Sequence, residues 1–117
     1  MKENHQSPIR KLSYSFALRS IKYAELLNEN RKFVISNQLL KSATSIGANV
    51  REAQYAESKA DFIHKLKISL KEANETEYWI ELCRDSEGYP DPGAMRDEVL
   101  VLIKMLSKSI STLQSRN

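Results

Sequence analysis

Apolar side chains recur at spacings of three and four residues along most of the chain, and polar side chains fill the positions between them. Side chains at these spacings share one face of an α-helix. Four such stretches, separated by polar or turn-forming segments, predict helices over residues 8–29, 36–55, 59–87 and 93–115. The chain has only three glycines and three prolines, which argues against a β-sandwich or barrel with its many turns.

The predicted core consists of one apolar stripe from each helix. In the second helix the stripe follows the strict four–three alternation that is typical of a bundle seam. The members of the four stripes are Ile9, Leu12, Phe16, Ala17, Ile21, Ala24 and Leu27; Leu39, Ala43, Ile46, Val50 and Ala53; Phe62, Ile63, Leu66, Leu70, Ala73, Ile80 and Cys83; and Met95, Val99, Leu102, Ile103, Leu106, Ile110 and Leu113.

Short loops join the four predicted helices, so consecutive helices must run in opposite directions. We therefore predict a single all-α domain over residues 1–117 that folds as an antiparallel up-and-down four-helix bundle. Gly47 lies inside the second helix, where glycine costs about 1 kcal/mol relative to alanine, and it predicts the close approach of a neighbouring helix. The alternative is a glycine that is tolerated on a solvated face.

Residues that favour helix ends support these boundaries. Ser7 is predicted to cap the first helix ahead of a proline, and Ser36 the second; the alternative is that residues 33–35 are helical too. Ser58 and Asp61 resemble a capping box at the start of the third helix. Gly88 is predicted to terminate that helix in the left-handed conformation.

Composition and the termini indicate a soluble protein of the cytoplasm. Hydrophobic residues make up 41% of the 117-residue chain, and charged residues make up 28%. Cys83 is the only cysteine, which excludes an internal disulfide and fits a reducing compartment. The N-terminus lacks the apolar stretch of a signal peptide, and no run of about eighteen apolar residues could span a membrane.

The charges are distributed unevenly. Residues 1–71 carry a formal charge of +7, residues 72–98 carry −7, and the remaining residues carry +3. Glu77, Glu81 and Asp85 follow one another at four-residue spacing, where like charges repel by about 0.2–0.5 kcal/mol per pair. We expect a basic surface of another copy to compensate this acidic segment. The alternative is a solvated face whose charges are screened by salt.

The inventory of reactive side chains predicts neither an enzyme nor a metal or cofactor site. His5 precedes the first helix, which leaves His64 as the one histidine within a predicted helix. Cys83 belongs to the apolar stripe of the third helix, as expected of a small core residue. The chain also lacks the repeated Glu-x-x-His motif of di-iron bundles and any glycine-rich phosphate loop.

Two features of the pattern suggest subunit contacts. Ser42, Ser45, Asn49 and Glu52 form a polar strip beside the seam of the second helix, which is either a solvated face or a set of specific hydrogen bonds. Some apolar residues lie outside the four stripes, and such residues often mark an oligomer interface, although scattered exposed residues would be normal. These residues are Leu18, Leu40, Tyr55, Trp79, Leu100 and Met105.

The segments 36–53, 57–66 and 72–79 resemble the bacterial four-helix-bundle proteins called 23S rRNA intervening-sequence proteins. The densest similarity is the motif SIGANVREA at residues 45–53. Its Ser45, Asn49 and Glu52 match the family pattern Ser-Ile-x-x-Asn-[Ile/Val]-x-Glu, and Glu75 matches a recurrent glutamate of the third helix. The resemblance implies that these four residues form a polar network or an interface.

The same resemblance implies a homo-oligomer, with a ring of five subunits as the recurrent form, and it brings no established activity. A related branch, the accessory proteins of diversity-generating retroelements, binds nucleic acid and is more basic than this chain. By analogy, the residues expected to contact phosphates are Arg10, Lys11, Arg19, Lys22 and Arg51. The alternatives are a protein–protein adaptor that binds no nucleic acid and a ligand-binding bundle, which would need an internal cavity.

Overall fold

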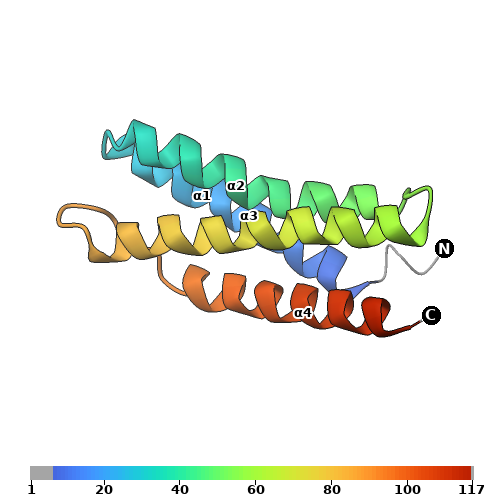
Figure 1. Ribbon diagram of the computed structural model, residues 1–117. Helices are drawn as coiled ribbons and strands as arrows, with labels where there is room; N and C mark the ends of the chain where they lie inside the picture. The colour runs from blue at the N-terminus through green and yellow to red at the C-terminus, as the bar shows by residue number, and fades with distance from the viewer. Residues whose placement is uncertain (1–6, 117) are drawn as a thin grey trace.

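A computed structural model of the chain describes residues 7–116 (Figure 1). Over these residues the chain forms four α-helices and no strand. The helices are α1 (Pro8–Glu29), α2 (Phe33–Ala53), α3 (Lys59–Asp85) and α4 (Met95–Ser115). The predicted all-α class with four helices is confirmed for the described part of the chain. None of these helices is both long and apolar enough to cross a membrane.

The helices lie side by side in an elongated molecule of 50 × 23 × 20 Å. α1 packs against α2 and α4, and α3 packs against the same two helices. Figure 1 shows the chain turning back at each loop, so that the start of α1 and the end of α4 lie at the same end of the molecule. These helix contacts are consistent with a bundle.

The starts of α1 and α2 differ from the predicted capping. Ser7 precedes α1, but its side chain makes no capping hydrogen bond. α2 begins at Phe33, before the predicted cap Ser36. Ser36 cannot cap the helix because its hydroxyl is buried and donates to the carbonyl of Ala24 in α1 at 3.0 Å. The residues before Ser36 therefore extend the helix.

The predicted signals around α3 are largely present. The Ser58 hydroxyl accepts from Asp61 N at 3.0 Å, so this cap is confirmed, although the Asp61 carboxylate accepts from Glu57 N and not from Ser58. α3 ends at Asp85, slightly earlier than predicted, and Gly88 in the following loop has a φ of 81°.

α4 begins at Met95, just after the predicted residue 93. Gly93 has a φ of 62°, which a right-handed helix does not allow. Its N–H donates to the Asp91 carboxylate at 3.0 Å, so the residues before α4 form a turn.

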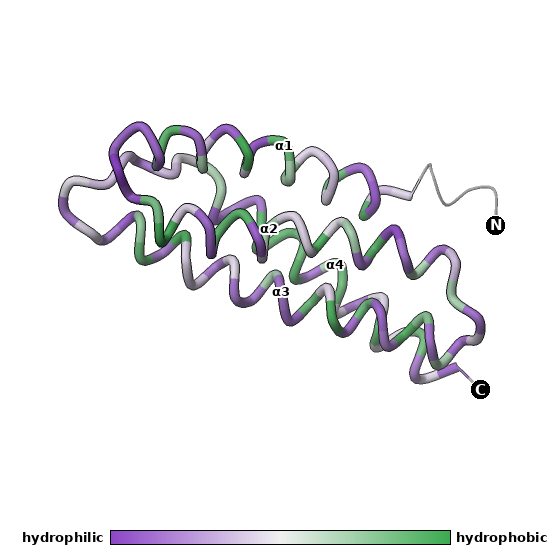
Figure 2. The backbone as a smooth tube through the Cα atoms, turned by 90° about the horizontal axis from the view of Figure 1, so that it is seen from above, coloured by the Kyte–Doolittle hydropathy of each residue, from purple (hydrophilic) through white to green (hydrophobic). Residues whose placement is uncertain are grey.

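The hydrophobic residues of the four helices meet in one core, and Figure 2 shows apolar and polar positions alternating along each helix. The predicted stripe of α2 is confirmed, because its members are at most 1% exposed: Leu39, Ala43, Ile46, Val50 and Ala53. The predicted stripe of α1 is partly wrong. Ile21 is 40% exposed, whereas Ser13, Ser20 and Tyr23 are buried.

Gly47 marks the close approach of α1 and α2 that the sequence predicts. A Cβ atom at this position would lie 3.4 Å from both the carbonyl oxygen and the hydroxyl of Ser13. This distance is an ordinary van der Waals contact, so alanine would fit against α1 with little room to spare.

Candidate functional site

The predicted polar residues of α2 bond mainly within their own helix. The Ser45 hydroxyl donates to the carbonyl of Lys41 at 2.7 Å, and the Asn49 amide donates to the carbonyl of Ser45 at 2.8 Å. Both residues are half-buried. They therefore satisfy their own hydrogen-bonding needs without a shared network.

The two predicted carboxylates bond to other partners. Glu52 is exposed and accepts from the Lys65 ammonium at 3.2 Å. Glu75 accepts from the Trp79 indole one turn further along α3, at 3.1 Å. The predicted network among Ser45, Asn49, Glu52 and Glu75 is thus not formed within the described subunit, and their role as interface residues stays a prediction.

The buried polar contacts between α2 and α3 involve residues that the sequence pattern did not indicate, apart from Ser42. The Ser69 hydroxyl donates to the carbonyl of Ile46 at 2.8 Å, and the Thr76 and Ser42 hydroxyls share a hydrogen bond of 2.8 Å. Ser69, Thr76 and Ser42 are all at most 1% exposed. Ser69 and Thr76 continue the spacing of the apolar stripe of α3, and this spacing was the signal that could have placed them in the core.

Tyr23 is a second buried polar residue that the pattern missed. Its hydroxyl donates to the carbonyl of Pro90 at 2.5 Å and so links α1 to the loop between α3 and α4. Burial, followed by the nearby Cys83 thiol, raises the pKa of the Tyr23 phenol. Burial also raises the pKa of Cys83, although its hydrogen bond with Tyr23 acts in the opposite direction. Both groups are therefore neutral and structural.

The acidic segment of α3 has a partner within its own subunit. Arg96 of α4 lies 3.2 Å from Glu77 and 2.9 Å from Glu81, and Asp85 pairs with the neighbouring Arg84. Each of these carboxylates thus has a partner within the subunit, and a contact with a basic surface of another copy stays a prediction. Replacing Glu77 and Glu81 by lysine would place positive charges beside Arg96 and disturb the contact between α3 and α4.

The five basic residues that were predicted to contact nucleic acid do not all lie at one site. These are Arg10, Lys11, Arg19, Lys22 and Arg51. Arg10 and Arg51 line one groove between α1 and α2, and Lys11 and Lys22 are exposed on α1. Arg19 Nε lies 2.9 Å from Glu98 Oε1 of α4, within range of an ion pair but without the angle of a hydrogen bond. Only Arg19 is therefore engaged with an acidic residue among the described contacts.

We call the recess between α1 and α2 the basic groove. It has a volume of about 370 Å³. Its lining residues are Arg10, Ser13, Tyr14, Ala17, Thr44, Gly47, Ala48, Arg51 and Glu52.

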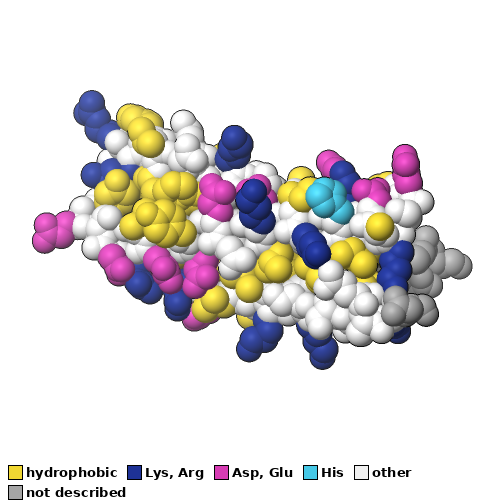
Figure 3. Space-filling view, in the orientation of Figure 1, with side chains coloured by type: hydrophobic (Ala, Val, Ile, Leu, Met, Phe, Trp, Pro, Cys, Tyr) yellow, Lys and Arg dark blue, Asp and Glu magenta, His cyan; other side chains and the backbone are white. Residues whose placement is uncertain are grey.

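Tyr78, Trp79 and Leu82 form an apolar surface that we call the α3 patch. Tyr78 and Leu82 are 56% and 37% exposed, and the rings of Tyr78 and Trp79 lie 5.2 Å apart between centroids. Figure 3 shows a broad hydrophobic area over the second half of α3, bordered by acidic side chains. Val34, at the start of the adjoining α2, is 78% exposed. The surface of the subunit thus has an extended apolar area on this face.

The predicted surplus residues are only partly exposed. Leu18 and Tyr55 are 49% and 79% exposed, as expected, whereas the other four are half-buried: Leu40, Trp79, Leu100 and Met105. The sequence pattern did not predict the exposure of Tyr14 on α1 or of Val34 and Tyr78. Their positions next to the core stripes gave no indication of which side of each stripe faces a neighbouring helix.

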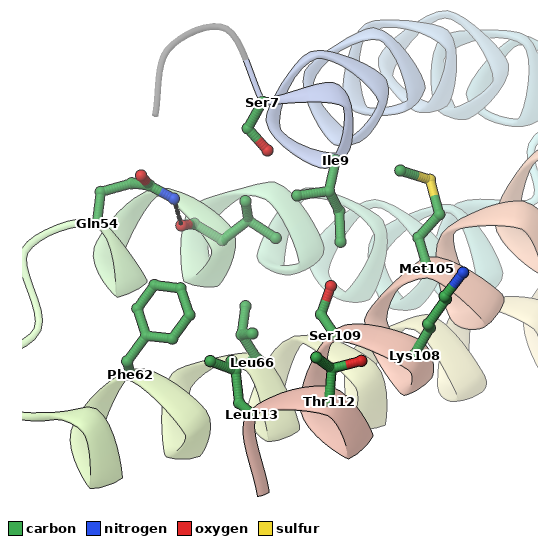
Figure 4. Close-up of a pocket in the computed structure, with 11 residues that line it drawn as sticks. Ser7, Ile9, Gln54, Phe62, Leu66, Met105, Lys108, Ser109, Thr112 and Leu113 are labelled. Carbon is green, nitrogen blue, oxygen red and sulfur yellow. Dashed lines mark hydrogen bonds between the residues drawn. The ribbon is translucent and has the colours of Figure 1, made fainter. Parts of the chain in front are cut away.

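A recess of about 470 Å³ lies at the end of the bundle where α1 begins and α4 ends (Figure 4). Ile9, Phe62 and Leu113 point toward one another from three helices. The Gln54 amide nitrogen donates to the carbonyl of Val50 at 3.3 Å, and its oxygen is buried without a hydrogen-bond partner in the described residues. This recess is open to solvent and is therefore not an enclosed internal cavity.

No group of three or more histidine, cysteine or carboxylate side chains that could hold a metal ion occurs in residues 7–116. Cys83 is buried in the core, and His64 is exposed on α3. His5 lies outside the described residues. The described part of the chain thus presents surfaces and grooves as its candidate sites.

Comparisons with known proteins point to one family. The family model described as 23S rRNA-intervening sequence protein matches residues 5–110. This chain is 46% identical in sequence to a protein from Bacteroides thetaiotaomicron whose crystal structure is known. That protein is described as one with unknown function from the S23 ribosomal protein family. The similarity covers 87% of this chain and 97% of that chain, with a TM-score of 0.81. No curated protein matches this chain.

Proposed function

This chain belongs to the 23S rRNA-intervening sequence protein family, and from that premise we propose that it is a non-enzymatic, homo-oligomeric binding module that associates with nucleic acid in the cytoplasm. The subunit in this proposal is an antiparallel up-and-down four-helix bundle, which the chain reversals and helix contacts support. The family resemblance leads us to expect a ring of five subunits.

The observation that carries the proposal is the α3 patch. Tyr78 and Leu82 are large apolar side chains that face outward, and Val34 adds to the exposed apolar surface. Contiguous apolar surfaces are rare on monomeric proteins and commonly mark sites of association. Since the same patch occurs on every copy, homo-oligomerisation is the simplest way to remove it from water.

Nucleic acid is the partner that the basic residues favour. Arg10 and Arg51 lie at one groove, and Lys11 and Lys22 are exposed at other positions of α1. Phosphate contacts of this kind release counterions, so affinity should fall steeply as salt increases.

The test is fluorescence anisotropy with labelled RNA and labelled duplex DNA, at salt concentrations from about 50 to 200 mM. We expect binding at the lower salt concentration and a marked loss of affinity at the higher one. The absence of binding to either nucleic acid at low salt would exclude this part of the proposal.

The alternative is a protein–protein adaptor in which the exposed surfaces serve assembly alone. It predicts the same oligomer together with no affinity for RNA or DNA, so the anisotropy experiment separates the two functions. The observation in its favour is the exposed apolar surface of the α3 patch, which any protein partner can cover.

A further candidate function, binding of a small apolar molecule, is favoured by the recess at the end of the bundle. Its volume of about 470 Å³ lies within the range of about 300–1,000 Å³ that is common for ligand pockets. A fluorescent fatty-acid analogue would test this function. Leu113→Trp, which fills the recess, should abolish its binding, and equal binding by both proteins would exclude the recess as the site.

A further inference from the structure

We infer that the basic groove binds a segment of single-stranded nucleic acid, with one base stacked on Tyr14 and the flanking phosphates held by Arg10 and Arg51. This inference rests on the proposed association with nucleic acid and specifies its site and the form of the polymer. The helix register, the shape of the groove, its charge and the exposed ring of Tyr14 all support this site.

The register of α1 and α2 sets the two arginines opposite each other. Ser36 of α2 donates to the carbonyl of Ala24 in α1, and further along α2 Gly47 lies against Ser13. Later residues of α2 therefore contact earlier residues of α1. The next turn of α2 brings Arg51 level with the first turn of α1, and both Arg10 and Arg51 line the groove. Two guanidinium groups thus flank one recess from two different helices.

Small side chains shape the groove between these arginines. Ala17 lies on the α1 side, and Gly47 and Ala48 lie on the α2 side. Gly47 lies against Ser13 of α1, and because it has no side chain it leaves the surface beside this contact open. The resulting volume of about 370 Å³ falls within the range of ligand pockets.

The charge of the groove favours an anion. Glu52 is its one acidic lining residue, and its carboxylate is bonded to Lys65 of α3 at 3.2 Å. Neither Arg10 nor Arg51 forms an ion pair with any acidic residue that the structure describes. Their guanidinium groups are therefore available to phosphates, which they can bind through paired N–H donors.

Tyr14 supplies the preference for a single strand. Its side chain is 59% exposed at the edge of the groove, in a position that no other helix covers. An exposed aromatic ring offers a stacking surface to a base, and only unpaired bases can leave their own stack to occupy it. A groove that pairs an aromatic ring with cations is the arrangement by which proteins hold single strands without reading their sequence.

The experiment compares a labelled single-stranded RNA of about 12 nucleotides, within the usual site size, with the same sequence as a duplex. Tyr14→Leu should weaken single-strand binding about tenfold, whereas Tyr14→Phe, which keeps the ring, should bind like the wild type. Log affinity falls linearly with log salt concentration, and Arg10→Gln and Arg51→Gln should each make this slope less negative by about 0.7. Lys104→Gln removes one positive charge from an exposed position of α4, away from the groove, and should leave the slope nearly unchanged. Circular dichroism of every variant checks the fold.

The outcomes separate this inference from the broader function. If the wild type binds RNA but Tyr14→Leu binds equally well, or if duplex and single strand bind alike, the groove is not the site and the broader proposal stands. If the wild type binds no nucleic acid at about 50 mM salt, the proposed association itself fails, and this site fails with it.

Discussion

Tyr23 lies on the buried face of α1 and holds the α3–α4 loop through its hydrogen bond to the carbonyl of Pro90. Tyr23→Phe keeps the ring in the core and removes this bond. We expect the free energy of unfolding to fall by about 1–2 kcal/mol, measured by urea unfolding. Tyr14→Phe is the control, because the Tyr14 side chain is exposed. Removing its hydroxyl should change the free energy of unfolding by less than about 0.5 kcal/mol. Equal stability of the two variants would contradict the role of Tyr23.

The raised pKa values of Tyr23 and Cys83 predict a loss of stability at alkaline pH. In the unfolded chain the thiol and the phenol ionise near their ordinary pKa values of 9.0 and 10.0, whereas the folded protein keeps both protonated to higher pH. Their contribution is therefore complete below about pH 9 and falls as the pH rises toward the folded-state values. The unfolding free energy of Tyr23→Phe should decline less steeply above pH 10 than that of the wild type. Parallel declines would show that Tyr23 is not the group responsible.

Single buried hydroxyls explain where the sequence was a poor guide to the core. Ser20 is fully buried and donates to the carbonyl of Phe16, one turn earlier in its own helix, at 2.8 Å. Thr76 does the same with Glu72 at 2.7 Å. Because such a hydroxyl carries its own hydrogen-bond partner, it can enter the core without the penalty of an unsatisfied polar group. A hydrophobicity pattern counts it as polar and assigns it to the surface.

At the level of elements, Arg96 joins α4 to the acidic half of α3. Arg96→Gln removes the cation between Glu77 and Glu81, and we expect it to lower the unfolding free energy by about 1 kcal/mol at low salt, with a smaller effect at high salt. Arg84→Gln is the matched control, because Arg84 pairs with the adjacent Asp85 of its own helix and joins no two helices. If Arg84→Gln proved as destabilising as Arg96→Gln, the contact between the helices would contribute nothing.

The helices themselves were predictable to within a few residues, because each core stripe repeats over several turns. The partners of the charged residues were not. Glu77 and Glu81 share a face by spacing alone, but nothing in the sequence shows that Arg96 of the next helix reaches both of them. The facing of Arg10 and Arg51 likewise depends on the register of two helices, which contacts such as Gly47 against Ser13 establish.

At the level of the whole molecule, the basic groove lies between α1 and α2, whereas the α3 patch lies on α3, so one subunit can use the two surfaces for different partners. Leu82→Lys places a positive charge in the α3 patch. The nearby acidic residues of α3 should stabilise this charge, so the subunit should still fold. We expect this variant to keep its helicity and to dissociate, as measured by sedimentation velocity. Val101→Lys, at a residue of α4 that is 48% exposed, should assemble like the wild type. Dissociation of both variants, or of neither, would place the contact elsewhere.

The mass of the wild-type protein in solution, measured by multi-angle light scattering, tests the central claim that exposed apolar surface drives this chain to associate with its own copies. The account predicts a species several times heavier than the 13.4 kDa chain, and the family resemblance predicts five times that mass. A single species of 13.4 kDa at the highest attainable concentration would contradict it.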